Sequence, residues 1–208
     1  MANIPMKTIR LHGLDDTYTI PTAPEHIGAA PAGYGLGETS NIGKWNGDAN
    51  TLTKQGWYRL ESGTTNGVGA SASVRVDGYA ETGLTQTAYT RTGFVLQRTC
   101  VDGTWGEWEY VNPPMQVGAE YRTTERCEGK AVYAKRINCY AAPASVDISS
   151  SNIEKVVRWS GFVTYYGVAL PCGNASWKVD INRNSISTTS AYDQASAHFY
   201  IDLYYTKS

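Results

Sequence analysis

Charge is scarce in this sequence and almost balanced. Asp, Glu, Lys and Arg make up 18% of the 208 residues, and the formal net charge is -1 at pH 7. Proteins hold nucleic acids mainly through positive side chains that displace counterions, and this chain has no such excess of positive charge. The composition therefore argues against a nucleic-acid partner.

Long apolar runs are also missing. No stretch approaches the roughly 20 apolar residues that a membrane-spanning helix needs. The first residues lack the basic region and apolar core that mark a secretion signal. We therefore expect no membrane insertion, and we expect the protein to be made and assembled in the cytoplasm.

The sequence contains only four cysteines, and no two of them form a Cys-x-x-Cys pair. They are Cys100, Cys127, Cys139 and Cys172. Such spacing indicates neither a zinc ribbon nor a redox motif. Free thiols are the simpler expectation in a protein made in the cytoplasm. A pair of disulfides, which four cysteines can form in three ways, stays open.

Histidines are few and scattered, at positions His12, His26 and His198. None of them is spaced with another histidine or a carboxylate in a ligand pattern, so we predict no metal site and no cofactor. One alternative stays open, in which a single histidine is presented three times around the axis of a trimer and binds a metal there.

Catalytic motifs are missing as well. There is neither a Gly-x-Ser-x-Gly elbow nor a phosphate-binding loop. A glycan-cleaving enzyme would need two carboxylates about 5 to 9.5 Å apart across a cleft. The adjacent pair Asp15 and Asp16, and the separate residues Asp147, Glu154 and Asp180, have no recognisable catalytic setting. We therefore predict that the protein is not an enzyme.

What the sequence has in abundance is glycine, with 21 residues, and rings that carry a polar edge, with 15 Tyr and 6 Trp against 3 Phe. Short stretches of β-formers separated by glycine-rich turns predict an all-β chain of antiparallel strands. In the first half these stretches are residues 57–60, 71–77, 85–90, 94–100 and 105–110. Asp102-Gly103 predicts a hairpin turn between the last two.

Asn112-Pro113-Pro114 ends this first set of strands, because proline cannot donate to a strand ladder. We place a domain boundary there. The sequence thus divides into an extended N-terminal segment and linker (1–32), a first β domain (33–114) and a C-terminal β-sandwich (115–208). The N-terminal segment cannot bury enough apolar surface alone, so it needs the next domain or copies of itself.

The C-terminal part shows clearer alternation. Glu128-Gly129 predicts a second hairpin turn, and residues 177–182 alternate apolar and polar side chains. In the last strand Phe199, Ile201, Leu203 and Tyr205 share one face, and the opposite face also carries rings, so both faces are expected to be covered. Only residues 152–158 give a weak helical pattern.

Two groups of rings are candidates for ligand contact. Trp105 and Trp108 would point to opposite faces of an extended strand, so we expect one in the core and one exposed or in an interface. In the C-terminal part, rings flank a loop of residues 171–174 and a second loop near position 192. The candidate ligand-binding residues are Tyr165, Tyr166, Asn174, Trp177, Tyr192, Asp193 and Gln194. Trp177 also fits the core, because it is in phase with Val179 and Ile181.

Several segments, taken in order, resemble phage and prophage tail fibres. Residues 30–38 are similar to a linker of such fibres, and Gly103-Thr104-Trp105-Gly106-Glu107-Trp108 resembles the hairpin that closes the pyocin-type knob domain. Gly56-Trp57-Tyr58, Gln86-Thr87-Ala88-Tyr89 and Gln97-Arg98 match the same knob. Residues 120–126, 129–133 and 203–207 are similar to the terminal domain that follows it. The chain lacks a long shaft and a virion-attachment region, which indicates a C-terminal part or a short fibre.

This resemblance implies a homotrimeric fibre tip in the virion that joins other tail proteins and contacts a bacterial surface glycan of the wall or capsule. It implies the function of a receptor-binding protein for host attachment, acting without catalysis. Two alternatives stay open. One is a structural or assembly module of the fibre with no host ligand, and the weaker one is a glycan depolymerase.

A trimer is the first testable expectation. Three copies of the N-terminal segment can bury apolar surface that one copy leaves exposed. We therefore expect a mass three times that of the 22.7 kDa chain, independent of concentration. Multi-angle light scattering over a hundredfold range of concentration measures it, and a particle of 22.7 kDa would contradict it.

Overall fold

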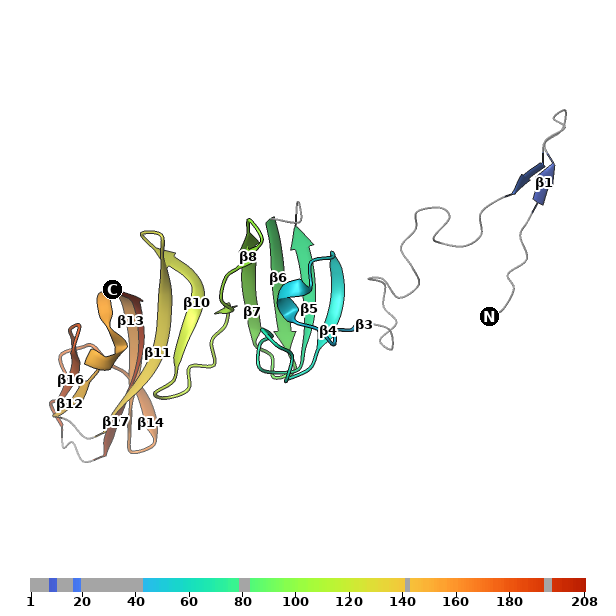
Figure 1. Ribbon diagram of the computed structural model, residues 1–208. Helices are drawn as coiled ribbons and strands as arrows, with labels where there is room; N and C mark the ends of the chain where they lie inside the picture. Colours follow the sequence, from blue (N-terminus) through green and yellow to red (C-terminus); the bar gives the residue numbers. More distant parts are fainter. Residues whose placement is uncertain (1–7, 11–16, 20–42, 79–82, 141–142, 193–195) are drawn as a thin grey trace.

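The computed structural model describes residues 8–10, 17–19, 43–78, 83–140, 143–192 and 196–208 (Figure 1). Within these ranges the regular structure consists of β-strands and two single-turn 3-10 helices, η2 (Ala49–Thr51) and η3 (Ser149–Ser151). No helix of the described part is long and apolar enough to cross a membrane. The predicted all-β class with mostly antiparallel pairing is confirmed.

The N-terminal segment is described only at β1 (Thr8–Arg10) and β2 (Thr17–Thr19), which pair antiparallel as a two-stranded sheet. The remainder of residues 1–32, with His12 and His26, lies outside the described residues. The linker at positions 30–38 also lies outside them. The expected part of this segment in trimerisation therefore stays a prediction.

The first β domain contributes strands in the order β9-β7-β6-β5-β4-β3, with β8 beside β7, to a 12-stranded sheet of the described residues. This sheet continues into the C-terminal domain, where β9 pairs in parallel with β10 (Glu120–Cys127). Its strands are β3 (Gly43–Lys44), β4 (Gly56–Leu60), β5 (Ala72–Gly78), β6 (Gly83–Thr90), β7 (Val95–Val101), β8 (Thr104–Trp105) and β9 (Glu109–Tyr110). Helix η2 packs on one face, where Ala49 and Leu52 meet the buried side chains of β5, such as Val74 and Val76. Alternate side chains of β5 point to this face, so the apolar ones form part of this core.

The predicted turn at Asp102-Gly103 is confirmed. Both residues have positive φ, 49° and 78°, and they join β7 to β8. Asp and Gly tolerate this left-handed region better than most residues, which is why the pair favours a tight hairpin. The following strand is shorter than predicted, because β8 ends at Trp105 and pairing to β7 resumes only at Glu109.

The C-terminal domain is a sandwich of two sheets, with orders β14-β13-β17-β11-β10 and β12-β16-β15. Its strands are β10 (Glu120–Cys127), β11 (Lys130–Tyr140), β12 (Ala144–Asp147), β13 (Ile153–Tyr165), β14 (Val168–Pro171), β15 (Trp177–Ile181), β16 (Ser185–Ser190) and β17 (Ala197–Lys207). The turn between β10 and β11 is Glu128-Gly129, as predicted, with φ of 53° and 80°.

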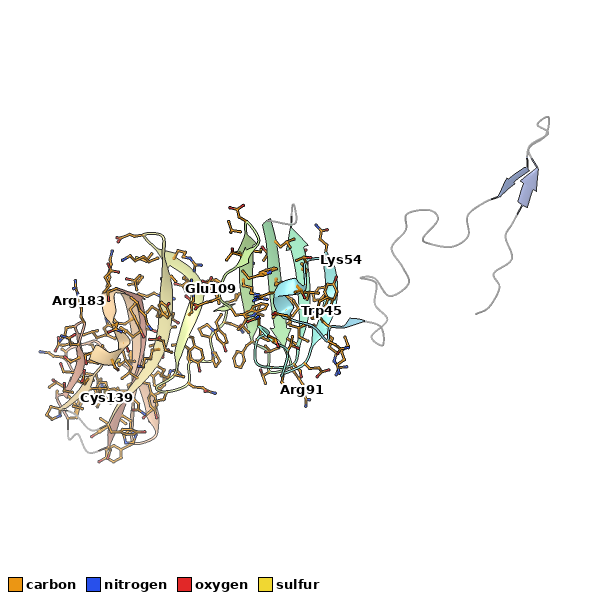
Figure 2. All side chains as sticks on the ribbon, viewed as in Figure 1. Trp45, Lys54, Arg91, Glu109, Cys139 and Arg183 are labelled. Carbon is orange, nitrogen blue, oxygen red and sulfur yellow. The ribbon has the colours of Figure 1, made fainter. Side chains whose placement is uncertain are left out.

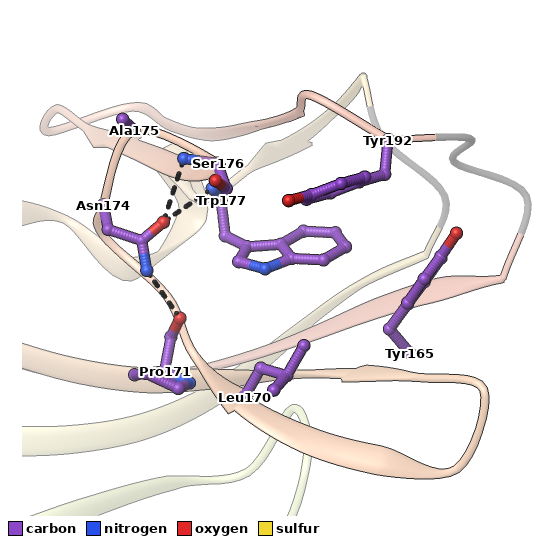
Figure 3. A pocket seen from close by; sticks show the side chains of 8 residues that line it. All are labelled: Tyr165, Leu170, Pro171, Asn174, Ala175, Ser176, Trp177 and Tyr192. Carbon is purple, nitrogen blue, oxygen red and sulfur yellow. Dashed lines mark hydrogen bonds between the residues drawn. The ribbon is translucent and has the colours of Figure 1, made fainter.

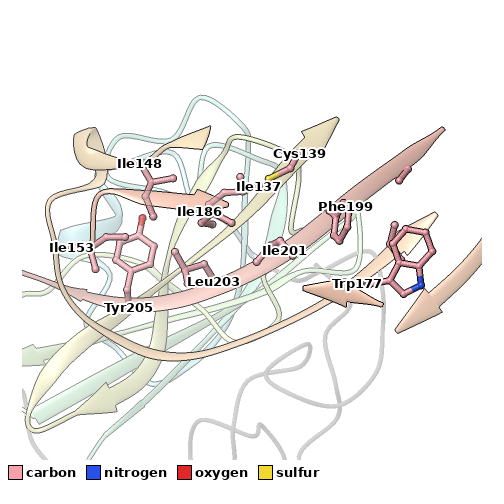
Figure 4. Packing of buried hydrophobic residues seen from close by; sticks show 12 residues of the cluster. Ile137, Cys139, Ile148, Ile153, Trp177, Ile186, Phe199, Ile201, Leu203 and Tyr205 are labelled. Atoms are coloured by element: carbon pink, nitrogen blue, oxygen red, sulfur yellow. The ribbon is translucent and has the colours of Figure 1, made fainter. Parts of the chain in front are cut away.

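Strand β17 runs through the centre of this sandwich. Phe199, Ile201, Leu203 and Tyr205 follow one another along one face and are fully buried (Figure 4). The Tyr205 hydroxyl donates a hydrogen bond to Glu120. The opposite face is half-buried, with Tyr200 stacked on Phe162 of β13 at 4.9 Å between ring centroids. The outer face is thus partly buried, which agrees with the expectation that both faces are covered.

The weak helical pattern at residues 152–158 does not correspond to a helix, because most of this segment belongs to strand β13. Asn152 ends helix η3 in the left-handed region, at φ 50°, and the chain then enters β13 at the buried Ile153. Register shifts between Ile153 and Lys155 and between Val156 and Arg158 break the strict alternation along β13. This irregularity removes the period-two signal and makes the segment look helical in sequence.

The two β domains meet at a buried carboxylate, that of Glu109, which Figure 2 shows between them. Arg122 Nε donates to Glu109 Oε1 at 2.7 Å, and Arg126 Nη2 donates to both Glu109 oxygens at 2.8 and 2.7 Å. Next to these bonds, Tyr110 contacts Tyr121 edge to face at 5.1 Å. The predicted boundary at 112–114 falls in the connection from β9 to β10.

Replacing Phe199 with alanine tests the central place of β17. Phe199→Ala removes a fully buried ring and leaves a cavity, so we expect the free energy of unfolding to fall by about 3 to 5 kcal/mol. Urea denaturation followed by circular dichroism measures this loss. Tyr140→Ala, on the adjacent β11 at a ring that is 63% exposed, is the matched control, with an expected loss of about 0.5 kcal/mol. Equal losses in the two variants would contradict the assignment.

Candidate ligand-binding site

The C-terminal domain carries a pocket of about 440 Å³, which we call the terminal pocket. Figure 3 shows Asn174 and Pro171 at one end, Tyr165 at the other and Trp177 between them. The lining residues are Tyr165, Leu170, Pro171, Asn174, Ala175, Ser176, Trp177 and Tyr192. The structure thus brings together four of the seven residues that the sequence indicated.

Hairpin β13–β14 positions the first ring. Tyr165 ends β13 and pairs with Val168, so the two-residue turn is Tyr166-Gly167, with φ of 46° and 78°. A tyrosine in the left-handed region is uncommon because its Cβ crowds the backbone. The Tyr166 ring is 73% exposed and packs edge to face on Tyr165 at 4.5 Å. Tyr166 therefore lies beside the terminal pocket and not among its lining residues.

The side chain of Asn174 folds the loop at the other end. Its Oδ1 accepts hydrogen bonds from the backbone N–H groups of Ser176 and Trp177, at 3.0 and 2.9 Å, and its Nδ2 donates to the Pro171 carbonyl at 3.0 Å. Asparagine commonly satisfies nearby backbone groups in this way. Most of its carboxamide is therefore occupied by the loop, and one Nδ2 hydrogen is left for a ligand.

Trp177 forms the floor. It begins β15 and is only 4% exposed, which confirms that it belongs to the core, and it contacts Phe199 of β17 at 6.0 Å. The rings of Tyr165 and Tyr192 approach it at 5.2 and 5.4 Å. Tyr192, by contrast, is 53% exposed. The ring that a ligand can cover broadly is thus Tyr192, while Trp177 offers an edge at the base.

Among the described residues, no charged side chain lines the terminal pocket. Cys172, at the base of the loop, brings no charge at neutral pH, because burial raises the pKa of its thiol. Asp193 and Gln194, also predicted to contact ligand, lie outside the described residues. The described residues that line the terminal pocket must therefore recognise a ligand through ring faces, backbone groups and hydroxyl groups.

Among the residues weighed for catalysis or metal binding, Asp15, Asp16, His12 and His26 lie outside the described residues, and the described ones are dispersed. Asp147 accepts a hydrogen bond from the Ser149 N–H at 2.8 Å, and Glu154 pairs with Lys130. His198 packs edge to face on Tyr140 at 4.8 Å. No cluster of three or more metal-binding side chains occurs in the part of the chain that the structure describes. All four cysteines are free thiols.

The prediction for the two tryptophans of the first domain was wrong about their direction, although Trp108 does pack against the core of this domain. Trp105 and Trp108 do not point to opposite faces; both are half-buried and both stack on the guanidinium of Arg98. The reason is the interruption between β8 and β9, because residues 106–108 belong to no strand and the alternation of side chains along a strand does not apply across them.

No protein-family model and no curated protein matches this chain. Three solved structures do. An N-truncated R2-type pyocin tail fibre is 12% identical, with 82% of this chain and 99% of that chain covered and a TM-score of 0.32. The C-terminal parts of the R1 and R2 pyocin fibres of P. aeruginosa are each 11% identical and cover 90% of this chain, and 71% and 70% of their own chains, with TM-scores of 0.33 and 0.34. The chain is thus similar over most of its length to pyocin tail fibres, the class that its sequence resembles, at TM-scores too low to assign a function by themselves.

Proposed function

We propose that this chain is the receptor-binding end of a phage-type tail fibre and that it attaches the particle to a bacterial surface glycan without cleaving it. The observation that carries the proposal is the terminal pocket, where three aromatic rings and a hydrogen-bonded loop form an open, uncharged depression. The resemblance of the sequence to tail fibres supports the same reading.

The chemistry of the terminal pocket suits a sugar. The apolar face of a pyranose stacks on aromatic rings, and Tyr192 offers such a face together with a hydroxyl. The loop of Asn174 adds polar groups at the other end of the terminal pocket, and Trp177 lies between this loop and the tyrosine rings. Ring and loop together can hold the face of a sugar and read its hydroxyl groups.

One such site is weak, because it is open and has few polar groups directed at a ligand. Three copies on one tip engage a surface together, and linked binding exceeds a single affinity by roughly 10² to 10⁴. We therefore propose a homotrimer that binds other tail proteins on one side and the envelope glycan with the C-terminal domain. Its location is the virion.

Tyr192→Ala tests the terminal pocket. The variant loses the most exposed ring of the lining, and we expect the binding of the fluorescently labelled protein to susceptible bacteria to fall by about tenfold or more. Flow cytometry across a concentration series measures it. Because Tyr192 is 53% exposed, we expect the variant to keep the fold, and thermal denaturation checks this.

Tyr140→Ala is the matched control, because it removes another exposed tyrosine of the same domain that does not line the terminal pocket. It should bind bacteria as the wild type does. Competition with defined wall and capsule glycans then identifies the ligand. Wild-type protein that fails to label bacteria and to block phage adsorption would favour the assembly module; equal binding by Tyr192→Ala would remove the terminal pocket from the function.

A further inference from the structure

A buried charge lies in the first β domain, far in sequence from the terminal pocket. Arg98, in the middle of β7, is only 5% exposed. Its Nε donates to Gln86 Oε1 at 2.9 Å and its Nη1 to Asn50 Oδ1 at 2.8 Å. Both acceptors are neutral amides. No carboxylate of the described residues makes a salt bridge with Arg98, which is unusual for a buried guanidinium.

Two indole rings hold the guanidinium in place. Its central carbon lies 4.7 Å from the ring centroid of Trp105 and 4.4 Å from that of Trp108. Each ring is itself fixed, since Trp105 Nε1 donates to the Asn50 carbonyl at 2.7 Å and Trp108 Nε1 to the Asn66 carbonyl at 2.9 Å. Cation–π attraction to the two rings partly offsets the loss of hydration.

The surrounding carboxylates are already engaged. Asp48 attracts Arg98 from a distance, but its oxygens accept hydrogen bonds from Asn66 Nδ2 and the Asn50 N–H. Glu107 is paired with Arg122 at 2.8 Å. Burial lowers the pKa of Arg98 to about 10, so the side chain still carries its charge at neutral pH.

One donor is left over. Arg98 Nη2 is buried and has no hydrogen-bond partner in the described part of the chain. A charged donor without a partner costs more than a neutral one, so the site is incomplete as it stands. Arg98 lines a pocket of about 360 Å³, which we call the Arg98 pocket. Its lining also includes Trp105, Trp108, Asn50, Asn66 and Glu107.

We propose that the Arg98 pocket binds the anionic group of an acidic sugar, a carboxylate or a phosphate, with Nη2 as the donor. A guanidinium suits both groups, and the flanking indoles offer apolar surface to the sugar ring. Segment 106–108 has no strand pairing, and its Gly106 N–H is bonded to the Thr99 carbonyl at 2.9 Å. Since Nη2 is buried in the free chain, the proposal requires that ligand binding displaces this segment outward.

The two pockets therefore have different chemistry. The terminal pocket is uncharged on its described lining, whereas the Arg98 pocket holds a cation. This inference goes beyond the proposed function, because the second site lies on another domain and selects for charge. It gives the chain a contact for acidic units of an envelope polymer in addition to neutral ones.

Tryptophan fluorescence of the full-length Tyr192→Ala variant measures the binding, because two indoles flank Arg98 and the loss of Tyr192 weakens the neutral-sugar site above Trp177. We expect a saturable change with glucuronate or with glucose 6-phosphate, and at least tenfold weaker binding of glucose. The anion that binds more tightly shows whether the pocket takes a carboxylate or a phosphate. An equal response to glucose, or no saturable response to either anion, overturns the proposal.

Two variants separate binding from folding. Arg98→Lys keeps the charge but loses the forked donors, and we expect roughly tenfold weaker binding of the anion. Glu107→Gln removes a negative charge from the lining, and we expect roughly threefold tighter binding, a gain that misfolding cannot produce. Arg91→Gln, in the exposed turn after β6, is the matched control and should change nothing. Unchanged anion affinity in both pocket variants overturns the proposal, and Tyr192→Ala should leave this binding intact.

Discussion

The burial of one face of strand β17 is the constraint on which the C-terminal domain depends. Its four apolar side chains fill the space between the two sheets, and the strand pairs with β11 on one side and β13 on the other. Phe199 supports the indole of Trp177, and the pairing with β17 fixes the end of β13 that presents Tyr165. The terminal pocket is therefore built directly on the core through Trp177 and Tyr165.

Local chemistry made much of this fold predictable. Asp102-Gly103 and Glu128-Gly129 form the predicted turns because few residues accept positive φ at both positions. The alternation of the last strand was equally clear. Strand β13 was missed, since its register shifts depend on pairing with β17, a partner more than 30 residues away. Arg98 is in phase with the buried Leu96 and Cys100 of β7, but the partners that make burial of its charge possible are rings and amides contributed by other segments.

The candidate site was predicted in part. The sequence indicated Tyr165, Trp177 and Tyr192, because rings beside turns suit a sugar site, and the structure brings them together. Leu170 and Pro171, which also line the pocket, were not among the candidate residues, although the loop that begins at Pro171 was. They lie on a short edge strand, and only the register of β14 on β13 shows where they are. Asn174 was expected to face a ligand, yet most of its side-chain amide is hydrogen-bonded to its own loop. The sequence cannot show which of these two roles an asparagine takes.

The Glu109 cluster has a mechanical consequence. A carboxylate that is withdrawn from solvent and held by Arg122 and Arg126 of the next domain resists both twisting and separation, since pulling the arginines away would leave it unpaired. Force applied to the C-terminal domain would therefore pass into the first domain through these ion pairs.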